Sequence, residues 1–399
     1  MTDSQSRPWW RMTYFVLMML VVEFMDEFFF SAFEAARPLI RDAFSLSYVE
    51  LGLMTTIPVL AAIVIEPIIG LFADTDKRRL LMIGGGVAYG IGLIIQGLAA
   101  TFLIFLLGAI LQFPAAGVFI NIAQAALMDD APTRRENRMA LWTLSGSLAV
   151  VIGPLTLAGL LALGIDWRIF FVVTGSLFVL ISLGLLRLPP NAALRSDAVD
   201  SDDDDSRSLR ENIHGAWDLL RQWLVWRWLI LLEFSNLMLD ILFALLALYM
   251  VDVVGVSQAQ AALAIIVWTG IGLMGDFLLI PLLEKIDGLV YLRFSAIMEL
   301  ILYPMFLLVD YWWLKLVLLG LIGLFNAGWY AILQGKLYDA LGEQSGAVLI
   351  VGNAAGIFGA IIPLILGVIA QVYGLNVAMW CLLISPIALI IGLPRRTDD

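Results

Sequence analysis

The sequence predicts an all-α integral membrane protein in which twelve transmembrane helices form two pseudo-symmetric bundles of six. Three observations lead to this fold class: an excess of apolar residues, long apolar runs, and a repeat that relates the two halves. Of 399 residues, 61% are hydrophobic and 14% are charged, whereas a soluble domain has about 45–50% apolar and about 25% charged residues. A water-soluble fold could not bury this excess, but a lipid bilayer accepts it as its own contact surface.

The apolar runs are long enough to cross a bilayer as helices. A transmembrane helix needs ~20 mostly apolar residues to cover ~30 Å of hydrocarbon. The runs are continuous and do not alternate with period two, which argues against the strands of a membrane barrel. The expected spans are 12–36, 48–73, 80–100, 102–128, 140–163, 168–188, 228–251, 259–283, 289–309, 312–336, 346–372 and 375–393.

The distribution of Lys and Arg predicts the orientation of these spans. If the N-terminus is cytoplasmic, all but four of the 23 Lys and Arg residues fall in inner segments. Such asymmetry is the positive-inside signal, in which Asp and Glu hardly count. We therefore expect a multi-pass protein of the cell inner membrane with both termini in the cytoplasm. The four exceptions are Arg37, Arg41, Arg168 and Lys315.

One long polar stretch divides the spans six and six. It holds an acidic run, 200–205, whose composition cannot bury a core and predicts disorder; plain solvation is its simple role and calcium binding is the alternative. Just after it, Ala216, Leu219, Leu220 and Trp223 recur at helical spacing and predict an amphipathic helix on the membrane surface. The expected domains are a cytoplasmic tail (1–11), an N-terminal six-helix bundle (12–188), a cytoplasmic linker (189–227), a C-terminal six-helix bundle (228–394) and a second cytoplasmic tail (395–399).

The two halves resemble each other when the chain is shifted by 210 residues. Acids are the informative matches, because an acid inside the membrane is rare. Two six-helix halves repeated in parallel are the plan of secondary transporters that rock about a central site, so the repeat favours transport over other membrane roles. The shift pairs Glu23 with Glu233, Asp42 with Asp252, Ser47 with Ser257, Glu66 with Asp276, Asp74 with Glu284, Gln124 with Gln334 and Asp129 with Asp339.

A motif comes directly after the second span. It reads Gly70-Leu71-Phe72-Ala73-Asp74-Thr75-Asp76-Lys77-Arg78-Arg79. This resembles the signature Gly-x-x-x-Asp-Arg-x-Gly-Arg-Arg of the major facilitator superfamily, with Thr75 and Lys77 in place of the usual Arg and Gly. The resemblance extends over essentially the whole chain and implies the superfamily's fold, with an acid and basic residues that latch the cytoplasmic side closed.

Further matches refine the resemblance. Gly146, Gly153 and Pro154 in the fifth span are similar to the superfamily's antiporter motif, and the segments 46–48 and 66–70 are similar to the fosmidomycin-resistance branch of drug exporters. With the repeat partners added, the expected gating residues are Gly70, Asp74, Arg78, Arg79, Asp129, Glu284, Gly153 and Pro154.

One departure from the superfamily pattern shifts attention to the acids. Many proton-driven exporters carry an Arg three residues before a Gln in the fourth span, but here Ala109 stands before Gln112. If protons drive transport, carboxyl groups must therefore carry them. A charged side chain at the bilayer centre costs ~2.5–3.5 kcal/mol, so acids there must face water, have a partner or be protonated.

The acids also share helical faces. Glu23, Glu27 and Glu34 line one stripe of the first span, and Glu233, Asn236 and Asp240 line one stripe of the seventh. By resemblance, these two helices line the central cavity of the superfamily. The expected proton-coupling and cavity residues are Glu23, Asp26, Glu27, Glu66, Glu233, Asp240 and Asp276, and the expected substrate-binding residues are Asn236, Gln124, Gln334, Asn326 and Trp329.

Structural alternatives exist for many of these residues. Glu66 and Asp276 are alternatively hydrogen-bond partners of neighbouring backbone, and Glu34 is alternatively an ion-pair partner of Arg37. The amides and aromatic residues are alternatively packing contacts between helices.

The function expected from these residues is proton-coupled export of a small amphipathic or cationic solute, because the cavity is acidic and poor in cations. The alternatives are uptake of a nutrient, lipid or metal cation by the same fold, or a membrane receptor or scaffold that does not transport. We expect the partners to be substrate, protons and the bilayer, and the chain to be a monomer.

Enzyme chemistry, ATP and nucleic acid have no support in the sequence. His214 and Cys381 are the single His and Cys, so no zinc, haem or thiol cluster is indicated, and no cofactor or metal is expected. There is no phosphate-binding Gly-x-x-x-x-Gly-Lys-Ser/Thr loop and no basic patch. Replacing Glu66 or Asp276 by its amide is expected to uncouple transport from the pH gradient.

Overall fold

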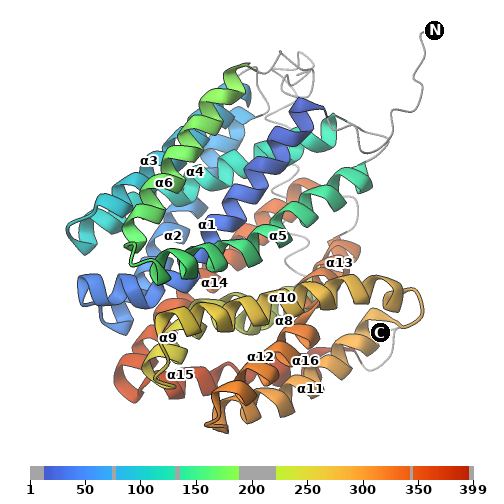
Figure 1. Ribbon diagram of the computed structural model, residues 1–399. Coiled ribbons are helices and arrows are strands. Elements are labelled where there is room, and N and C mark those ends of the chain that lie inside the picture. Colours follow the sequence, from blue (N-terminus) through green and yellow to red (C-terminus); the bar gives the residue numbers. More distant parts are fainter. Residues whose placement is uncertain (1–12, 74–77, 131–134, 188–221, 342–344, 395–399) are drawn as a thin grey trace. The chain divides into compact units, whose positions relative to one another are not determined.

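The computed structural model describes residues 13–73, 78–130, 135–187, 222–341 and 345–394. Within these ranges the chain is helical apart from short connections, and it contains no strand (Figure 1). The helices are α1 (Tyr14–Phe44), α2 (Tyr48–Ala73), α3 (Arg78–Leu98), α4 (Phe102–Asp129), α5 (Arg135–Ala162), α6 (Trp167–Gly184) with a 3-10 turn (Leu185–Arg187), α8 (Trp223–Asn236), a π-helical turn η4 (Leu237–Ile241), α9 (Leu242–Asp252), α10 (Gln258–Leu283), α11 (Gly288–Leu308), α12 (Trp312–Asn326), α13 (Trp329–Leu341), α14 (Ser345–Tyr373), α15 (Leu375–Cys381) and α16 (Ile384–Gly392).

Ten segments of the described chain are long and apolar enough to cross a membrane. Two of them each combine two successive helices, α12 with α13 and α15 with α16, and a third joins α8 to α9 through the π turn. The remaining two expected spans are α1, which has 31 residues but three acids within five positions, and α14, which has 29 residues. The prediction of an all-α, multi-pass membrane protein is confirmed.

Several helix bounds differ from the expected ones. α1 continues to Phe44, beyond the expected end at 36, and α5 and α8 begin at Arg135 and Trp223, about five residues early. The length of an apolar run reports only the part of a helix that lies inside hydrocarbon. Helices continue into the polar interface, where charged residues are also stable. The surface helix expected at 216–223 lies outside the described residues except for its last two positions, and the acidic run 200–205 lies outside them entirely.

The described chain forms two compact units that do not follow the midpoint of the sequence. Unit 1 comprises 1–31, 64–153 and 166–199, and unit 2 comprises 32–63, 154–165 and 200–399. The boundaries pass through α1, α2 and α5, so one end of each of these helices belongs to unit 2. The first three acids of α1 therefore fall in unit 1, whereas Glu34 falls in unit 2.

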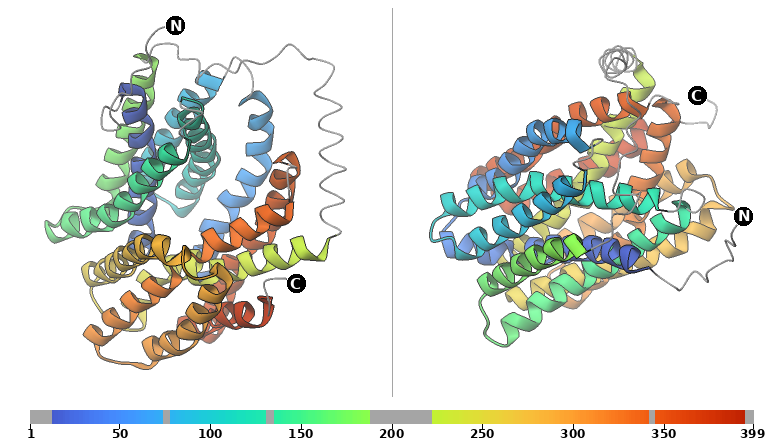
Figure 2. Two further views of the ribbon diagram at one scale, coloured as in Figure 1. Left: turned by 90° about the vertical axis from the view of Figure 1, so that its right-hand side faces the viewer. Right: turned by 90° about the horizontal axis from the view of Figure 1, so that it is seen from above.

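Glycine allows close helix packing within unit 1. α3 lies beside α4 and α6 (Figures 1 and 2). A methyl group at Gly92 would lie 2.8 Å from the Gly108 carbonyl oxygen, and one at Gly97 would lie 2.9 Å from the Arg168 carbonyl oxygen. Small residues at such contacts let backbones approach, which is how membrane helices associate without a hydrophobic driving force.

Unit 2 contains a local structure that appears twice. Ser47 and Glu50 form a capping box at the start of α2, with the Ser47 amide donating to Glu50 Oε2 at 2.8 Å. Ser257 and Gln260 form the same motif at the start of α10, 210 residues later.

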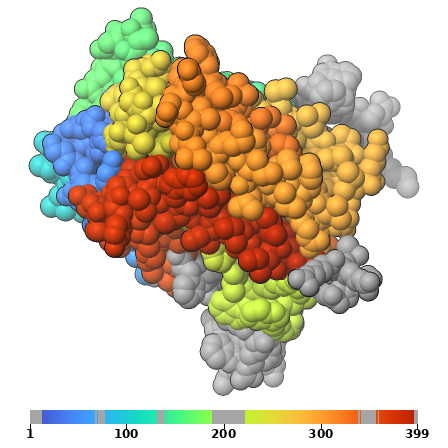
Figure 3. Space-filling view, turned by 90° about the horizontal axis from the view of Figure 1, so that it is seen from below, coloured from blue at the N-terminus to red at the C-terminus, as the bar shows by residue number. Residues whose placement is uncertain are grey.

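On the face of unit 2 drawn in Figure 3, the C-terminal helices lie beside α8 and α11, in agreement with the contacts of α16.

Candidate transport site

The acids of α1 pack against a glycine of α5 in unit 1. Glu23 is 8% exposed, and a methyl group at Gly146 would lie 2.6 Å from its Oε1 and 3.2 Å from Glu27 Cγ. Any side chain at position 146 would therefore displace the carboxyl group. Glu23 has no hydrogen-bonding or ion-pair partner among the described residues. Gly153, further along α5, packs in the same way against Ser31.

Asp26 differs from Glu23 because it has a hydrogen-bond donor. The hydroxyl of Tyr89 on α3 donates to Asp26 Oδ1 at 2.7 Å. Tyr89 is itself 1% exposed. A buried hydrogen bond therefore links α1 to α3 inside unit 1.

Glu66 on α2 lies against a glycine of α4. It is half-buried, and a methyl group at Gly117 would overlap its carboxyl group. No hydrogen bond or ion pair of Glu66 is present within the described residues. The backbone bond expected by the structural alternative is therefore not seen for this acid.

Unit 2 repeats the arrangement of acid against glycine at Glu233. This half-buried residue of α8 has its Oε2 2.6 Å from where a methyl group at Gly359 of α14 would lie. Asn236 follows three residues later and is half-buried, and Asp240 is exposed on the π turn. Glu23 and Glu233, which the repeat pairs, thus each face a glycine, at Gly146 and Gly359 respectively.

The π turn is held by one of the expected substrate-binding residues. Asn326 Nδ2 donates to the Met238 carbonyl oxygen at 3.1 Å, and Asn326 is 5% exposed. Trp329 is fully buried, with its Nε1 donating to Ser295 Oγ at 2.7 Å. Both side chains thus make the interhelical packing bonds of the structural alternative. Gln124 and Gln334 are half-buried, and the nearest acceptor of Gln124 is the sulfur of Met139 at 3.8 Å.

Asp276 serves a break in the tenth span. α12 ends at Asn326 and α13 begins at Trp329, with Gly328 between them at φ +73°. The Gly328 amide donates to Asp276 Oδ1 at 3.0 Å, and the Tyr291 hydroxyl donates to the Ala327 carbonyl oxygen at 3.0 Å. Both backbone groups released by the break are satisfied, which matches the structural alternative for Asp276.

Some of the expected gating residues form ion pairs and caps in unit 1. Arg78 Nη1 is 2.9 Å from Asp129 Oδ2, and Arg79 Nη2 donates to the Leu186 carbonyl oxygen at 2.7 Å. Asp74 lies outside the described residues. Gly70 lies in α2, Glu284 is exposed at the end of α10, and Pro154 is buried within α5.

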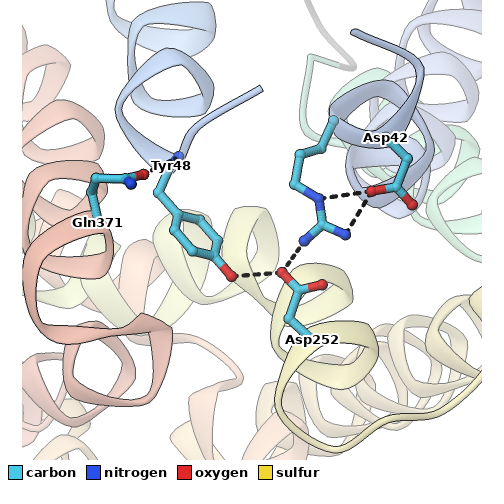
Figure 4. Close-up of polar contacts among 5 residues, drawn as sticks. Asp42, Tyr48, Asp252 and Gln371 are labelled. Carbon is cyan, nitrogen blue, oxygen red and sulfur yellow. Dashed lines mark hydrogen bonds and ion pairs between the residues drawn. The ribbon is translucent and has the colours of Figure 1, made fainter. Parts of the chain in front are cut away.

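At the ends of its helices, unit 2 contains a polar cluster that the sequence did not predict (Figure 4). Arg41 at the end of α1 forms ion pairs with Asp42 and with Asp252 at the end of α9. The Tyr48 hydroxyl donates to Asp252 Oδ2 at 2.7 Å, and the Tyr48 amide donates to Gln371 of α14 at 3.0 Å. We call these five residues the Arg41 cluster.

Next to the Arg41 cluster, α2 and α14 pack through glycines. A methyl group at Gly52 would lie 2.7 Å from the Pro363 carbonyl oxygen, and one at Gly367 would lie 2.5 Å from the Tyr48 carbonyl oxygen. One turn further, Thr56 Oγ1 donates to the Ala360 carbonyl oxygen at 2.8 Å. Positions 48, 52 and 56 therefore form one stripe of α2 that meets α14, and we call this contact the α2–α14 seam.

A buried ion pair lies next to the seam. Arg37 Nη2 donates to Glu34 Oε1 at 2.8 Å and to Thr55 Oγ1 at 3.1 Å, with both charged side chains 4% exposed. This is the Glu34–Arg37 pairing expected as the alternative. Arg37 also lines a cavity of about 20 Å³ with Tyr48 and apolar residues of α9 and α14. Such a volume holds about one water molecule.

The helices, the intramembrane acids and the absence of strands in the described ranges define a multi-pass helical membrane protein of the secondary-transporter type. The chain belongs to the Major Facilitator Superfamily, whose family model matches residues 17–360. The resemblance read from the sequence is therefore confirmed, and the chain is a transporter and not an enzyme.

Individual similar proteins extend this result. The chain is 27% identical over 159 residues to a "Probable sugar efflux transporter" of Helicobacter acinonychis (strain Sheeba), and the match covers 39% of this chain and 40% of that protein. The chain thus spans about two fifths of the length of this curated relative.

Two solved structures share the fold. An inward-facing bacterial homologue of the human lysosomal transporter Spinster has a TM-score of 0.74 at 18% identity, covering 95% of each chain. The nucleoside transporter NupG has a TM-score of 0.68 at 12% identity, covering 96% of this chain and 98% of that one.

The sequence did not indicate the roles of Tyr89, Arg41 and Tyr48. Arg41 stands beside Asp42, which the repeat pairs with Asp252, so a cation next to a repeated acid was the available signal. Tyr89 had no such signal, because an aromatic residue in a membrane span is common and its partner lies 63 residues away.

Proposed function

We propose that the chain is a proton-coupled exporter of small amphipathic or cationic solutes, working by alternating access in the cell inner membrane with both termini in the cytoplasm. The observation that carries this proposal is a set of acids without cationic partners. Glu23, Glu66 and Glu233 each face a glycine of a neighbouring helix, and none has an ion-pair partner within the described residues. An unpaired carboxylate in a membrane helix must be protonated or must bind a cation during the cycle.

Alternating access requires gates at both ends. With the N-terminus in the cytoplasm, the Arg41 cluster and the α2–α14 seam lie at the outer end, and the Arg78–Asp129 pair lies at the inner end. The contacts of the Arg41 cluster are polar, so they can exchange for water when that end opens. Breakable contacts of this kind suit an element with two states.

Two considerations support the substrate class and the direction. The acids without partners favour cations or neutral amphipathic molecules over anions, because an anion would add to an uncompensated negative charge. The partial match to a protein named as a sugar efflux transporter supports export and makes a neutral sugar the second candidate.

The test uses purified protein in liposomes with an imposed pH gradient. We would screen tetraphenylphosphonium, ethidium, sugars and nucleosides for gradient-driven flux. Glu66→Gln is expected to abolish the dependence on the gradient, and the matched control Asp310→Asn, an exposed acid between α11 and α12, should leave it unchanged. Flux that ignores the gradient in the wild type would overturn proton coupling. Binding without any flux would instead favour a receptor.

Flux in the opposite direction would favour uptake. Stabilisation by a divalent metal that disappears in Glu23→Gln would favour a metal substrate.

A further inference from the structure

Helix α1 contains two acids, Glu23 and Asp26, that are three residues apart and have different surroundings. Glu23 is 8% exposed, faces Gly146 and has no hydrogen-bond donor in the described part of the chain. Asp26 accepts a hydrogen bond of 2.7 Å from the Tyr89 hydroxyl. Two acids whose surroundings differ in this way can hold different charges at the same pH, even when they are one helical turn apart.

Tyr89 is held firmly in place by the packing of unit 1. Its ring stacks on Phe178 of α6, with ring centroids 4.1 Å apart and planes 25° apart, and meets Phe29 edge-on at 6.3 Å. Gly90, next along α3, packs directly on α6 at Gly175. The hydroxyl is therefore presented to Asp26 by a ring that cannot easily turn away.

The direction of the hydrogen bond favours one charge state of Asp26. The Tyr89 hydroxyl donates to Asp26 Oδ1, and a donated hydrogen bond stabilises the ionised form of a carboxyl group. The charged groups near Asp26 are Glu23 and Glu27 on α1, and burial disfavours a negative charge on Asp26. Among the described residues, α5 presents Gly146 to these acids and α6 presents aromatic rings, so the Tyr89 hydroxyl is the group that stabilises the charge of Asp26.

We propose that Tyr89 is a positioning residue that keeps Asp26 ionised as the anchor for the positively charged group of the substrate, while Glu23 is the acid that takes up and releases the proton. This division of roles rests on the proposed function for its relevance to transport. It explains why two acids so close together are both present. A single acid would have to lose the substrate whenever it gained the proton.

The first test needs no substrate and uses infrared spectroscopy of the purified full-length protein to follow the protonated carboxyl band during a pH titration. Glu23→Gln should remove a protonated carboxyl that is present at neutral pH, and Asp26→Asn should not. Tyr89→Phe should add a protonated carboxyl, which the double variant Tyr89→Phe/Asp26→Asn should lack.

The matched control is Tyr249→Phe, because the Tyr249 hydroxyl bonds to a backbone carbonyl and Lys315 and to no carboxyl group. This variant should leave the carboxyl band unchanged. Tyr89→Phe keeps the ring that packs on Phe178, so thermal unfolding should shift little. An unchanged carboxyl band in Tyr89→Phe overturns the proposal, and so does a band lost in Asp26→Asn instead of Glu23→Gln.

The second test separates this inference from the proposed function. For a cationic substrate found in the transport screen, Tyr89→Phe should raise KM about tenfold with kcat retained, as expected when one charge-assisted hydrogen bond to the anchor is lost. Glu23→Gln should instead remove the dependence on the pH gradient. If no cationic substrate is transported, the proposed function fails, while the infrared titration still decides the roles of Tyr89, Asp26 and Glu23.

Discussion

Glu66 and Asp276 are 210 residues apart and are paired by the internal repeat, yet their surroundings differ. Glu66 lies against Gly117 in helix α4, which runs from Phe102 to Asp129 without a break. Asp276 lies at a break between α12 and α13 and accepts a hydrogen bond from the Gly328 amide. Position 117 shifted by 210 is 327, so both acids meet the same stretch of the repeated fold.

This difference shows that a repeated acid need not keep one role. Where the partner helix is continuous, the carboxyl group finds no donor and stays available for a proton. Where the helix is interrupted, the carboxyl group satisfies the released amide and becomes part of the scaffold. We infer that Glu66, more than Asp276, belongs to the proton-coupling set.

The largest expected effect is on flux that depends on the pH gradient, and it should differ between the variants of Glu66 and Asp276. Glu66→Gln should abolish flux that depends on the pH gradient, whereas Asp276→Asn should keep that dependence, because its carbonyl oxygen can still accept from Gly328. Gradient-driven flux in liposomes measures both. Loss of gradient dependence in Asp276→Asn would restore the equivalence of the two halves.

The next effect concerns stability at the break. Asp276→Ala leaves the Gly328 amide without its acceptor and should lower the free energy of unfolding by about 1–3 kcal/mol. Thermal unfolding in detergent measures the loss. The matched change Glu66→Ala removes no hydrogen bond seen in the structure and should cost less, so equal losses would contradict the comparison.

Gly328→Ala tests the break from the backbone side. Gly328 has φ +73°, and an added methyl group would overlap Leu279, so a loss of roughly 1–3 kcal/mol in unfolding free energy is expected. Gly335→Ala is the control, since no atom lies within 4 Å of its added methyl group. That control should be neutral or stabilising by up to about 1 kcal/mol, as for any exposed helical glycine.

The smallest expected effect is at the Arg41 cluster, where the repeat pairs Asp42 with Asp252 but Arg41 has only Val251 as its counterpart. Arg41→Met should lower the unfolding free energy by only about 0.2–1 kcal/mol, because the ion pairs are partly exposed. Thermal unfolding at low and high salt measures this, with Arg41→Lys as the control. A loss that does not shrink at high salt would assign the effect to packing and not to charge.

Much of the fold could be predicted from the sequence, because lipid imposes a length and a composition on every span. The expected spans were found on that basis, with helix ends that differed where helices continue into the interface, and the superfamily was found from the motif at 70–79. The break at Gly328 and the π turn could not be predicted in this way. Both are stabilised by side chains from other helices, namely Asp276, Tyr291 and Asn326.

The candidate site was predicted in its residue types but not in its contacts. Spacing alone placed Glu23 and Glu233 on helical stripes, and the structure adds the glycines that face them. Spacing in the sequence could not distinguish Asp26 from Glu23, because the hydrogen-bond donor Tyr89 lies on another helix. Residue type also predicted a binding role for Asn326 and Trp329, and the structure adds that Asn326 Nδ2 and Trp329 Nε1 donate hydrogen bonds to other helices.

The π turn at Leu237–Ile241 has a consequence for how the chain tolerates length changes. Such a turn accommodates one more residue than a regular helical turn, and each residue of an α-helix rotates the remainder of the helix by about 100°. Because the π turn absorbs the additional residue within one turn, deleting Leu239 would be expected to restore a uniform helix and leave Asp252 facing Arg41 and Tyr48. A deletion within the regular helix α9 would instead turn the carboxylate of Asp252 by about 100°, away from both partners.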